Sequence, residues 1–321
     1  MAIKRATLNL TQEANAIESY GAWQISASAS VQTISAGGGT SKVTASAKRT
    51  RTYTSGASDT ESGTPTYSWA NGTTGYTGFS LEKSTGTVTA SNRRTTVGNA
   101  RTCTVRVTMG TETKDVTITQ EANQITDTTY SIGLGATTGT TPETALPASG
   151  GTTNLAVSGN IQYTYTSGAQ SSGSFDPDVS IKEGPSSESG FGVLNGVVTA
   201  LSMGTTEYPD GRTATVVASG NGVTKELTIY QAENIKTLES ITAGTNPAWT
   251  ETAKGETATV VVKAKYTFTS GSVSNENKTN FEITNSSAGW LTYSGTSVIS
   301  ANRGTTVGPV RTAALTVSYS E

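Results

Sequence analysis

The chain has 321 residues, of which 35 are glycine and only 14% are charged, and its formal net charge is -2. A composition rich in glycine, threonine and serine suits short strands joined by turns and disfavours long helices, so we expect an all-β protein with room for two or three domains. The near-neutral, scattered charge argues against nucleic acid as a partner.

The first predicted element lies at the amino terminus, where MAIKRATLNLTQEAN alternates apolar and polar residues. Alternation is typical of a β-strand, and we expect one over Thr7, Leu8, Asn9, Leu10, Thr11 and Gln12. A secretory signal would need an apolar run of about 7 to 15 residues, so we expect synthesis without a signal peptide. We also expect no membrane anchoring, because no apolar run approaches the roughly 18 residues that cross a bilayer.

The rest of the chain contains three copies of one unit, recognised by recurring motifs. The first motif is TYTSGA or TFTSGS, at 52–57, 164–169 and 267–272. The second motif contains an Arg-Thr pair and reads NRRTTVGNART at 92–102, MGTTEYPDGRT at 203–213 and NRGTTVGPVRT at 302–312. This alignment makes Arg101, Arg212 and Arg311 equivalent.

The third motif is an alternating strand with a fixed ending, and one of its copies is displaced. It reads LNLTQEANAI at 8–17, VTITQEANQI at 116–125 and LTIYQAENI at 227–235. The first copy precedes every repeat, whereas the third repeat reaches TVSYSE where its own copy would begin. We therefore divide the chain into a donor strand (1–15), repeat one (16–122), repeat two (123–233) and repeat three (234–321), which lacks its own last strand.

Within each repeat, alternating runs recur at the spacing of a β-sandwich. We predict three tandem immunoglobulin-like β-sandwiches, the third completed by the N-terminal strand. The strand after each Arg-Thr pair should point one side chain set inward, namely Cys103, Val105 and Val107, then Ala214, Val216 and Ala218, then Ala313, Leu315 and Val317. One aromatic side chain per repeat should fill the core, and spacing to Ala90, Ala200 and Ala301 selects Phe79, Phe191 and Trp290.

The residues offer little catalytic chemistry. The chain has no histidine, the commonest general base and transition-metal ligand, so we expect no enzyme, no cofactor and no metal. Cys103 could be a nucleophile, but alanine at the sister positions favours a buried structural thiol. Asp176 and Asp178, in FDPDV, are interpreted as solvated acids at a turn rather than as a hydrolytic pair or a calcium site.

Two further groups of residues have alternative interpretations. Tyr67, Trp69 and Tyr76, in PTYSWANGTTGY, could contact a glycan, whereas alternation along a strand favours Tyr67 and Trp69 as fillers of the first sandwich. The repeated charges are interpreted as strand ends and inter-domain contacts, and they are Arg101, Arg212, Arg311, Glu13 and Glu121.

Three segments carry a resemblance to a known family: GWLTYSG from Gly289, RTATVVASGNGVTKELTIYQ from Arg212 and TITQ from Thr117. Together they resemble BACON-type and related bacterial immunoglobulin-like domains, found in gut Bacteroidetes proteins and in virions of their phages. The resemblance implies a virion structural protein on the particle surface, a capsid auxiliary or decoration protein or a fibre-like protein, contacting the major capsid protein or other virion proteins. The alternatives are a carbohydrate-binding adhesion module and a subunit of a bacterial fibre or surface layer.

The displaced strand suggests a mechanism of assembly. A sandwich without its last strand exposes unpaired backbone groups and part of its core, which invites strand addition. We therefore expect Thr7 to Gln12 to complete repeat three, either in its own chain, giving a closed ring, or in a neighbouring subunit, giving self-association. Both topologies stay open, and the high local concentration in a virion favours exchange between subunits.

Overall fold

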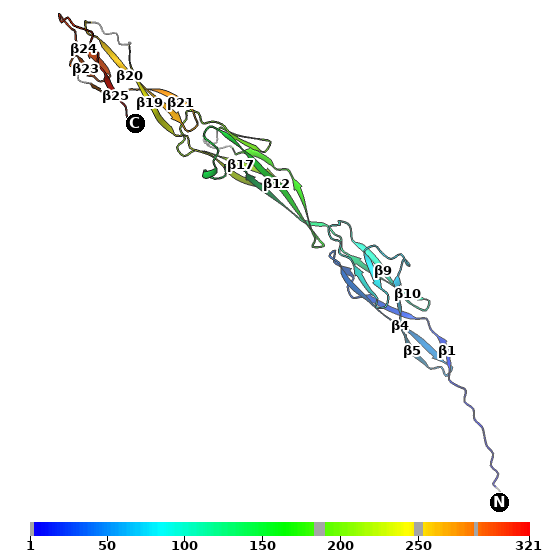
Figure 1. Cartoon of the computed structure of the whole chain (residues 1–321). Coiled ribbons are helices and arrows are strands. Elements are labelled where there is room, and N and C mark those ends of the chain that lie inside the picture. The colour runs from blue at the N-terminus through cyan, green and yellow to red at the C-terminus, as the bar shows by residue number, and fades with distance from the viewer. Residues whose placement is uncertain (1–2, 183–189, 247–252, 286–287) are drawn as a thin grey trace. The chain divides into compact units, whose positions relative to one another are not determined.

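The computed structural model describes residues 3–182, 190–246, 253–285 and 288–321. Apart from one short 3-10 helix, Pro142–Thr144, all regular elements within these described ranges are β-strands (Figure 1). This all-β architecture confirms the fold class expected from the composition and the alternating runs.

Repeat one folds into two sheets. Its strands are β1 (Ile17–Tyr20), β2 (Gln24–Ala29), β3 (Thr33–Ile34), β4 (Gly39–Tyr53), β5 (Ser58–Gly63), β6 (Thr66–Trp69), β7 (Phe79–Glu82), β8 (Thr87–Ala90), β9 (Arg101–Met109) and β10 (Glu112–Gln120). One sheet has the order β1-β4-β8-β7, with β2 and β5 also paired to β4, and the other has the order β3-β10-β9-β6. The short β3 runs parallel to β10. Two sheets with these strand orders form an immunoglobulin-like sandwich in which β10 is the last strand.

Repeat two has the same plan. Its strands are β11 (Ile125–Ala136), β12 (Gly151–Tyr165), β13 (Gln170–Phe175), β14 (Asp178–Ile181), β15 (Phe191–Leu194), β16 (Val197–Ala200), β17 (Arg212–Gly220) and β18 (Val223–Gln231). The sheets have the orders β11-β12-β16-β15, with β13 on β12, and β14-β17-β18. A parallel bridge between Leu146 and Gln231 takes the place of β3.

Repeat three departs from this plan in its second sheet. Its strands are β19 (Lys236–Asn246), β20 (Thr257–Phe268), β21 (Val273–Lys278), β22 (Glu282–Asn285), β23 (Leu291–Ser294), β24 (Ser297–Ser300) and β25 (Leu315–Ser318). The first sheet has the order β19-β20-β24-β23, with β21 on β20, but the second contains only β22 and β25. Among the described residues, therefore, nothing occupies the position that β10 and β18 occupy in the other repeats.

The hydrophobic cores show the consequence of that open position. The inward sets of β9 and β17 are buried, as predicted, and they are Cys103, Val105, Val107, Ala214, Val216 and Ala218. In repeat three, Leu315 and Val317 are only half-buried, and Ala313 is exposed. Regular pairing also begins later, because β9 and β17 start at their Arg residues whereas β25 starts at Leu315.

The strand register corrects one sequence alignment. Phe79 pairs with Ala90 and Phe191 with Ala200, as the spacing predicts. In repeat three, however, the residue in this place is Leu291, which pairs with Ser300. Trp290 lies one residue earlier, where the backbone carbonyl accepts the same hydrogen bond that Gly78 accepts in repeat one.

By compactness the chain divides into two units, residues 1–130 with 160–174, and residues 131–159 with 175–321. The dividing line crosses repeat two, because the turn between β12 and β13 packs with repeat one. The domain limits at 122/123 and 233/234 stay predictions.

Candidate assembly site

In repeat one, a buried glutamine fixes the end of the last strand. Gln120 closes β10, and its fully buried side chain donates from Nε2 to the carbonyl oxygens of Ser35 at 3.0 Å and Ser91 at 2.9 Å. Its Oε1 accepts a hydrogen bond of 2.7 Å from Nε of Arg101. A Cβ atom on Gly78 would collide with that guanidinium, so glycine at this position leaves room for the arginine.

Repeat two contains the same pairing of a strand-end arginine with a buried glutamine, which we call the clamp. Gln231 Nε2 donates to the carbonyl oxygens of Pro147 and Leu201, and Arg212 Nε donates to Gln231 Oε1 at 2.7 Å. Arg212 is buried, and its guanidinium lies 5.3 Å from the centre of the Phe191 ring. Arg101 and Arg212 are the first residues of β9 and β17, as the strand-end interpretation predicts, and their bonds to Gln120 and Gln231 lie within their own repeats.

Three residues after Gln120, an asparagine joins repeat one to the turn between β12 and β13 of repeat two, a contact that we call a joint. The side chain of Asn123 is fully buried. Its Nδ2 donates to the carbonyl oxygens of Arg94 at 2.7 Å and Thr96 at 3.0 Å, and its Oδ1 accepts from the backbone N–H of Ser167 at 2.9 Å. Asn123 and Gly98 also exchange two backbone hydrogen bonds. One amide thus bonds to two loops.

The next joint repeats these contacts atom for atom. Asn234 Nδ2 donates to the carbonyl oxygens of Gly204 at 3.1 Å and Thr206 at 2.7 Å, and its Oδ1 accepts from the N–H of Ser270 at 2.8 Å. The Ser270 hydroxyl donates to the Gly204 carbonyl at 2.6 Å. Sequence reasoning found the three motifs that meet here but treated them as separate markers, although their joint recurrence was a signal of contact.

At the amino terminus, half of such a joint is present. Asn15 Oδ1 accepts hydrogen bonds from the backbone N–H of Ser55 at 3.2 Å and from the hydroxyl of Thr54 at 3.3 Å. No described residue accepts a hydrogen bond from its Nδ2. The loop that an equivalent joint would use lies in repeat three, at Gly304 and Thr306, by alignment with the second motif.

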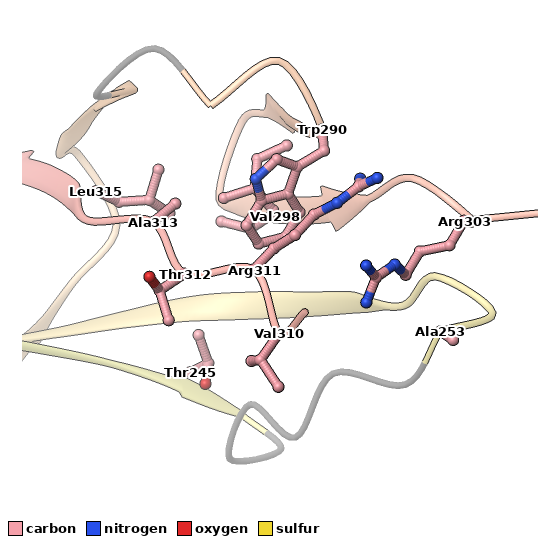
Figure 2. A pocket seen from close by; sticks show the side chains of 11 residues that line it. Thr245, Ala253, Trp290, Val298, Arg303, Val310, Arg311, Thr312, Ala313 and Leu315 are labelled. Carbon is pink, nitrogen blue, oxygen red and sulfur yellow. The ribbon is translucent and has the colours of Figure 1, made fainter. Parts of the chain in front are cut away.

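The open edge of repeat three forms a groove of about 570 Å³. It is lined by Thr245, Ala253, Trp290, Leu291, Val298, Arg303, Val310, Arg311, Thr312, Ala313 and Leu315. Figure 2 shows Trp290, Val298 and Arg311 close together at this groove. The volume falls in the range of ligand pockets, but the groove is bordered by residues 310–313 and by Leu315, the first residue of β25. The residues aligned with 311–315 in the other repeats pair with β10 and β18.

Within the part of the chain that the structure describes, the side chain of Arg303 also lacks one hydrogen-bond partner at this open edge. Its Nη2 donates to the carbonyl of Pro309 at 2.9 Å, but its buried Nε has no hydrogen-bond partner among the described residues. In repeat one, the equivalent Arg93 donates both to the carbonyl of Asn99 and to that of Glu121, the residue after Gln120. A buried donor without a partner is costly, so this position of repeat three lacks an acceptor.

The predicted donor strand is exposed in the isolated chain. Residues 3–16 form no strand, and Leu8 and Leu10 are 80% and 87% exposed. The side chains aligned with Leu10 are Ile118 and Ile229, both completely buried. Strand formation by Thr7, Leu8, Asn9, Leu10, Thr11 and Gln12 in repeat three, of the same chain or of a second subunit, stays a prediction.

The candidate glycan residues contact the core of repeat one. Tyr67, Trp69 and Tyr76 are half-buried and pack against its buried residues, with the rings of Trp69 and Tyr76 edge to face at 5.3 Å. This placement is the one that the core-filling interpretation predicts. Ring faces that stack on a sugar need to be open, so glycan binding stays a prediction without a supporting contact.

The remaining candidates have no reactive surroundings. Cys103 is completely buried, and burial raises the pKa of its thiol to about 11. Asp176 and Asp178 are exposed, as expected for solvated acids. Among the described residues, no group of three or more Cys, Asp or Glu side chains could hold a metal ion, and no helix is long and apolar enough to cross a membrane.

Comparison with solved structures gives distant likenesses, among them those to a titin chimera and to a desmocollin ectodomain. No family model and no curated protein matches the chain. A chimeric titin Z1Z2 carrying an exogenous decorin peptide is 13% identical, with 66% of this chain and 99% of that chain covered and a TM-score of 0.22. The human desmocollin-1 ectodomain is 10% identical, with 91% and 76% covered and a TM-score of 0.21. Likenesses this low carry no inference about function.

Proposed function

We propose that this chain is a non-enzymatic structural protein of a virion, an auxiliary or decoration protein on the capsid of a tailed bacteriophage. The observation that supports a structural role is the pair of inter-repeat joints, where Asn123 and Asn234 are completely buried and bonded to two loops each. A buried, fully bonded amide ties the end of one repeat to a turn of the next, whereas a flexible linker leaves its amides to water. The virion setting rests on the resemblance of the repeats to BACON-type domains.

In this role the sandwiches would bind the major capsid protein or other virion proteins through sheet edges and loops. Contacts made by several repeats of one chain add up through effective concentration, so each single contact can be weak. The chain would then lie on the particle surface and tie coat subunits together.

Mass spectrometry of gradient-purified particles tests this proposal. We expect the chain in the particle fraction at a constant ratio to the major capsid protein through successive purification steps. An abundant soluble host protein serves as the control for carry-over. A chain that is abundant in the lysate of infected cells, but falls with that control during purification, would contradict the proposal.

The carbohydrate-binding alternative is separated by a glycan array. Wild type and Trp69→Ala are compared, with Tyr293→Ala as the control because Tyr293 is an exposed aromatic residue of repeat three. Glycan binding by wild type that is lost only in Trp69→Ala, with the fold retained, would favour an adhesion module. Absence of binding to every glycan leaves the structural role as the better account.

A further inference from the structure

We propose that residues 7–15 of one copy of this chain bind the open edge of repeat three in a second copy, so that chains join head to tail. This inference names a partner within the structural role proposed above. It rests on three observations: the free strand position, the exposed segment with the matching sequence, and the half-built joint at Asn15.

The strand pairing of the complete repeats fixes the register. In repeat one, Gln120, Ile118 and Val116 lie opposite Arg101, Cys103 and Val105. In repeat two, Gln231, Ile229 and Leu227 lie opposite Arg212, Ala214 and Val216. The same register in repeat three places Gln12 opposite Arg311, Leu10 opposite Ala313 and Leu8 opposite Leu315.

The side chains of the donor segment fit this position. Leu8 and Leu10 point to the same side of a strand, because side chains alternate between its faces, and they would face the groove. Val298 and Leu291 of the groove are buried members of the core of repeat three, and Leu315 packs against that core. Docking would therefore remove two exposed leucines from water and bury the half-covered inner face of β25.

Polar groups complement each other after the strand. Glu13 aligns with Glu121, whose carbonyl accepts from Nη1 of Arg93 in repeat one, so the Glu13 carbonyl would bring an acceptor to the guanidinium of Arg303, whose buried Nε is unpaired among the described residues. Asn15 would then complete its joint, donating from Nδ2 to the carbonyl oxygens of Gly304 and Thr306 as Asn234 does to Gly204 and Thr206.

The ends of a repeat argue for a second copy. In repeat one, the turn that meets Asn15 follows the last residue of β4, whereas the first residue of β4 pairs with Ala90, next to the loop that meets Asn123. The 15 residues of β4 span about 50 Å at about 3.3 Å per residue. A repeat thus receives its two neighbours at opposite ends. A head-to-tail contact between two copies would use these same two ends, one from each copy.

One contact of the complete repeats does not carry over. Trp290 takes the place of Gly78 and Gly190, the residues that leave room for the guanidinium groups of Arg101 and Arg212. The bond from arginine to glutamine is therefore not assigned to Arg311 and Gln12. The proposal depends on the apolar contacts, the backbone pairing and the Asn15 joint.

The first experiment measures the mass of the full chain against concentration by analytical ultracentrifugation. We expect wild type to form oligomers whose mass increases with concentration, and Leu10→Asp to remain monomeric. Leu194→Asp is the matched control, because Leu194 is also an exposed leucine, at 74%, but lies on repeat two. Leu10 is exposed in the isolated chain, so its substitution leaves folding intact. Wild type that stays monomeric at every concentration would overturn the inference.

The second experiment tests the register by cross-linking. In a Cys103→Ala background, the pair Leu10→Cys with Ala313→Cys should give a ladder of disulfide-linked chains on non-reducing gels. The pair Asn9→Cys with Ala313→Cys is the control, because residue 9 faces away, and it should give at most a trace of the ladder. A cross-link found only within single chains would overturn exchange between copies in favour of ring closure.

Both experiments use purified protein, so they are independent of the particle test. Head-to-tail joining with no presence in particles would remove the virion role and leave this inference standing. If the chain is present in particles but the purified protein stays monomeric and forms no cross-link, the virion role would stand and this inference would fall.

Discussion

The joint between repeats one and two gives the sharpest stability prediction. Asn123→Ala removes three hydrogen bonds between a buried amide and backbone groups of two loops. A net contribution of about 1 kcal/mol for each bond gives a loss of about 3 kcal/mol in the free energy of opening this region. That loss corresponds to roughly a 150-fold increase in the population of the opened state.

Hydrogen–deuterium exchange measures this effect where it arises. The backbone N–H of Ser167 donates to Asn123 Oδ1, so a peptide covering 164–169 should exchange much faster in Asn123→Ala. Peptides from β20 in repeat three should be unchanged. Asn123→Asp should be worse than alanine, because it places a carboxylate oxygen against the carbonyl oxygens of Arg94 and Thr96.

Asn15→Ala, studied in a sample kept monomeric, is the matched control for the exchange experiment on Asn123→Ala. Asn15 has the same sequence context, but its contacts with Thr54 and Ser55 are exposed. We expect a loss of under about 1 kcal/mol from such solvent-accessible bonds. Equal effects of Asn15→Ala and Asn123→Ala, or an Asn123→Ala exchange pattern like wild type, would refute the reasoning that burial of the amide makes the joint.

Two further predictions concern titratable groups. The Cys103 thiol, with its pKa raised to about 11 by burial, should resist a thiol reagent at pH 8 until the protein is unfolded in denaturant, and rapid labelling of the native chain would contradict its burial. Hydrogen bonds from Lys236 and Lys278 lower the pKa of Glu276 to about 2, below the roughly 4.3 of an unfolded glutamate, so its contribution to stability is present above pH 4.3 and is lost as the pH falls toward 2. The melting temperatures of wild type and Glu276→Gln should therefore differ at pH 6 and converge near pH 2. A difference that stays constant with pH would contradict a stabilising role of ionised Glu276.

Local patterns were enough to predict the sandwiches. Alternation in TCTVRVT identified the inward set Cys103, Val105 and Val107, all of them completely buried, because side chains on a strand alternate between core and solvent. Recurrence of the motifs located three copies of the unit. The alternating run and each copy of a motif span only a few residues, and over that distance a sequence pattern indicates local structure directly.

Features that depend on distant segments were not predicted. Asn123 bonds to residues near 95 and to Ser167, so its role depends on a fold that brings three loops together. The alignment of Trp290 with Phe79 failed for a different reason. The turn from β23 to β24, between Ser294 and Ser297, is shorter than the turn from β7 to β8, so equal spacing did not mean an equal place in the sheet.

The last strand of a repeat, the joint and the first strand of the next repeat are one continuous segment. Strand addition between copies would therefore differ from simple pairing of two exposed sheet edges. Residues 116–123 complete one sandwich, form the joint and lead directly into β11, the first strand of the next sandwich. A repeat is thus completed by the chain segment that begins its successor. If residues 7–15 of a second copy complete repeat three, the joint and repeat one of that copy must follow, in the same order. Because donor and acceptor surfaces differ, the contact is heterologous and does not close after one exchange. Each added chain presents a new open repeat three, so growth would continue until the segment or the edge is occupied by another partner.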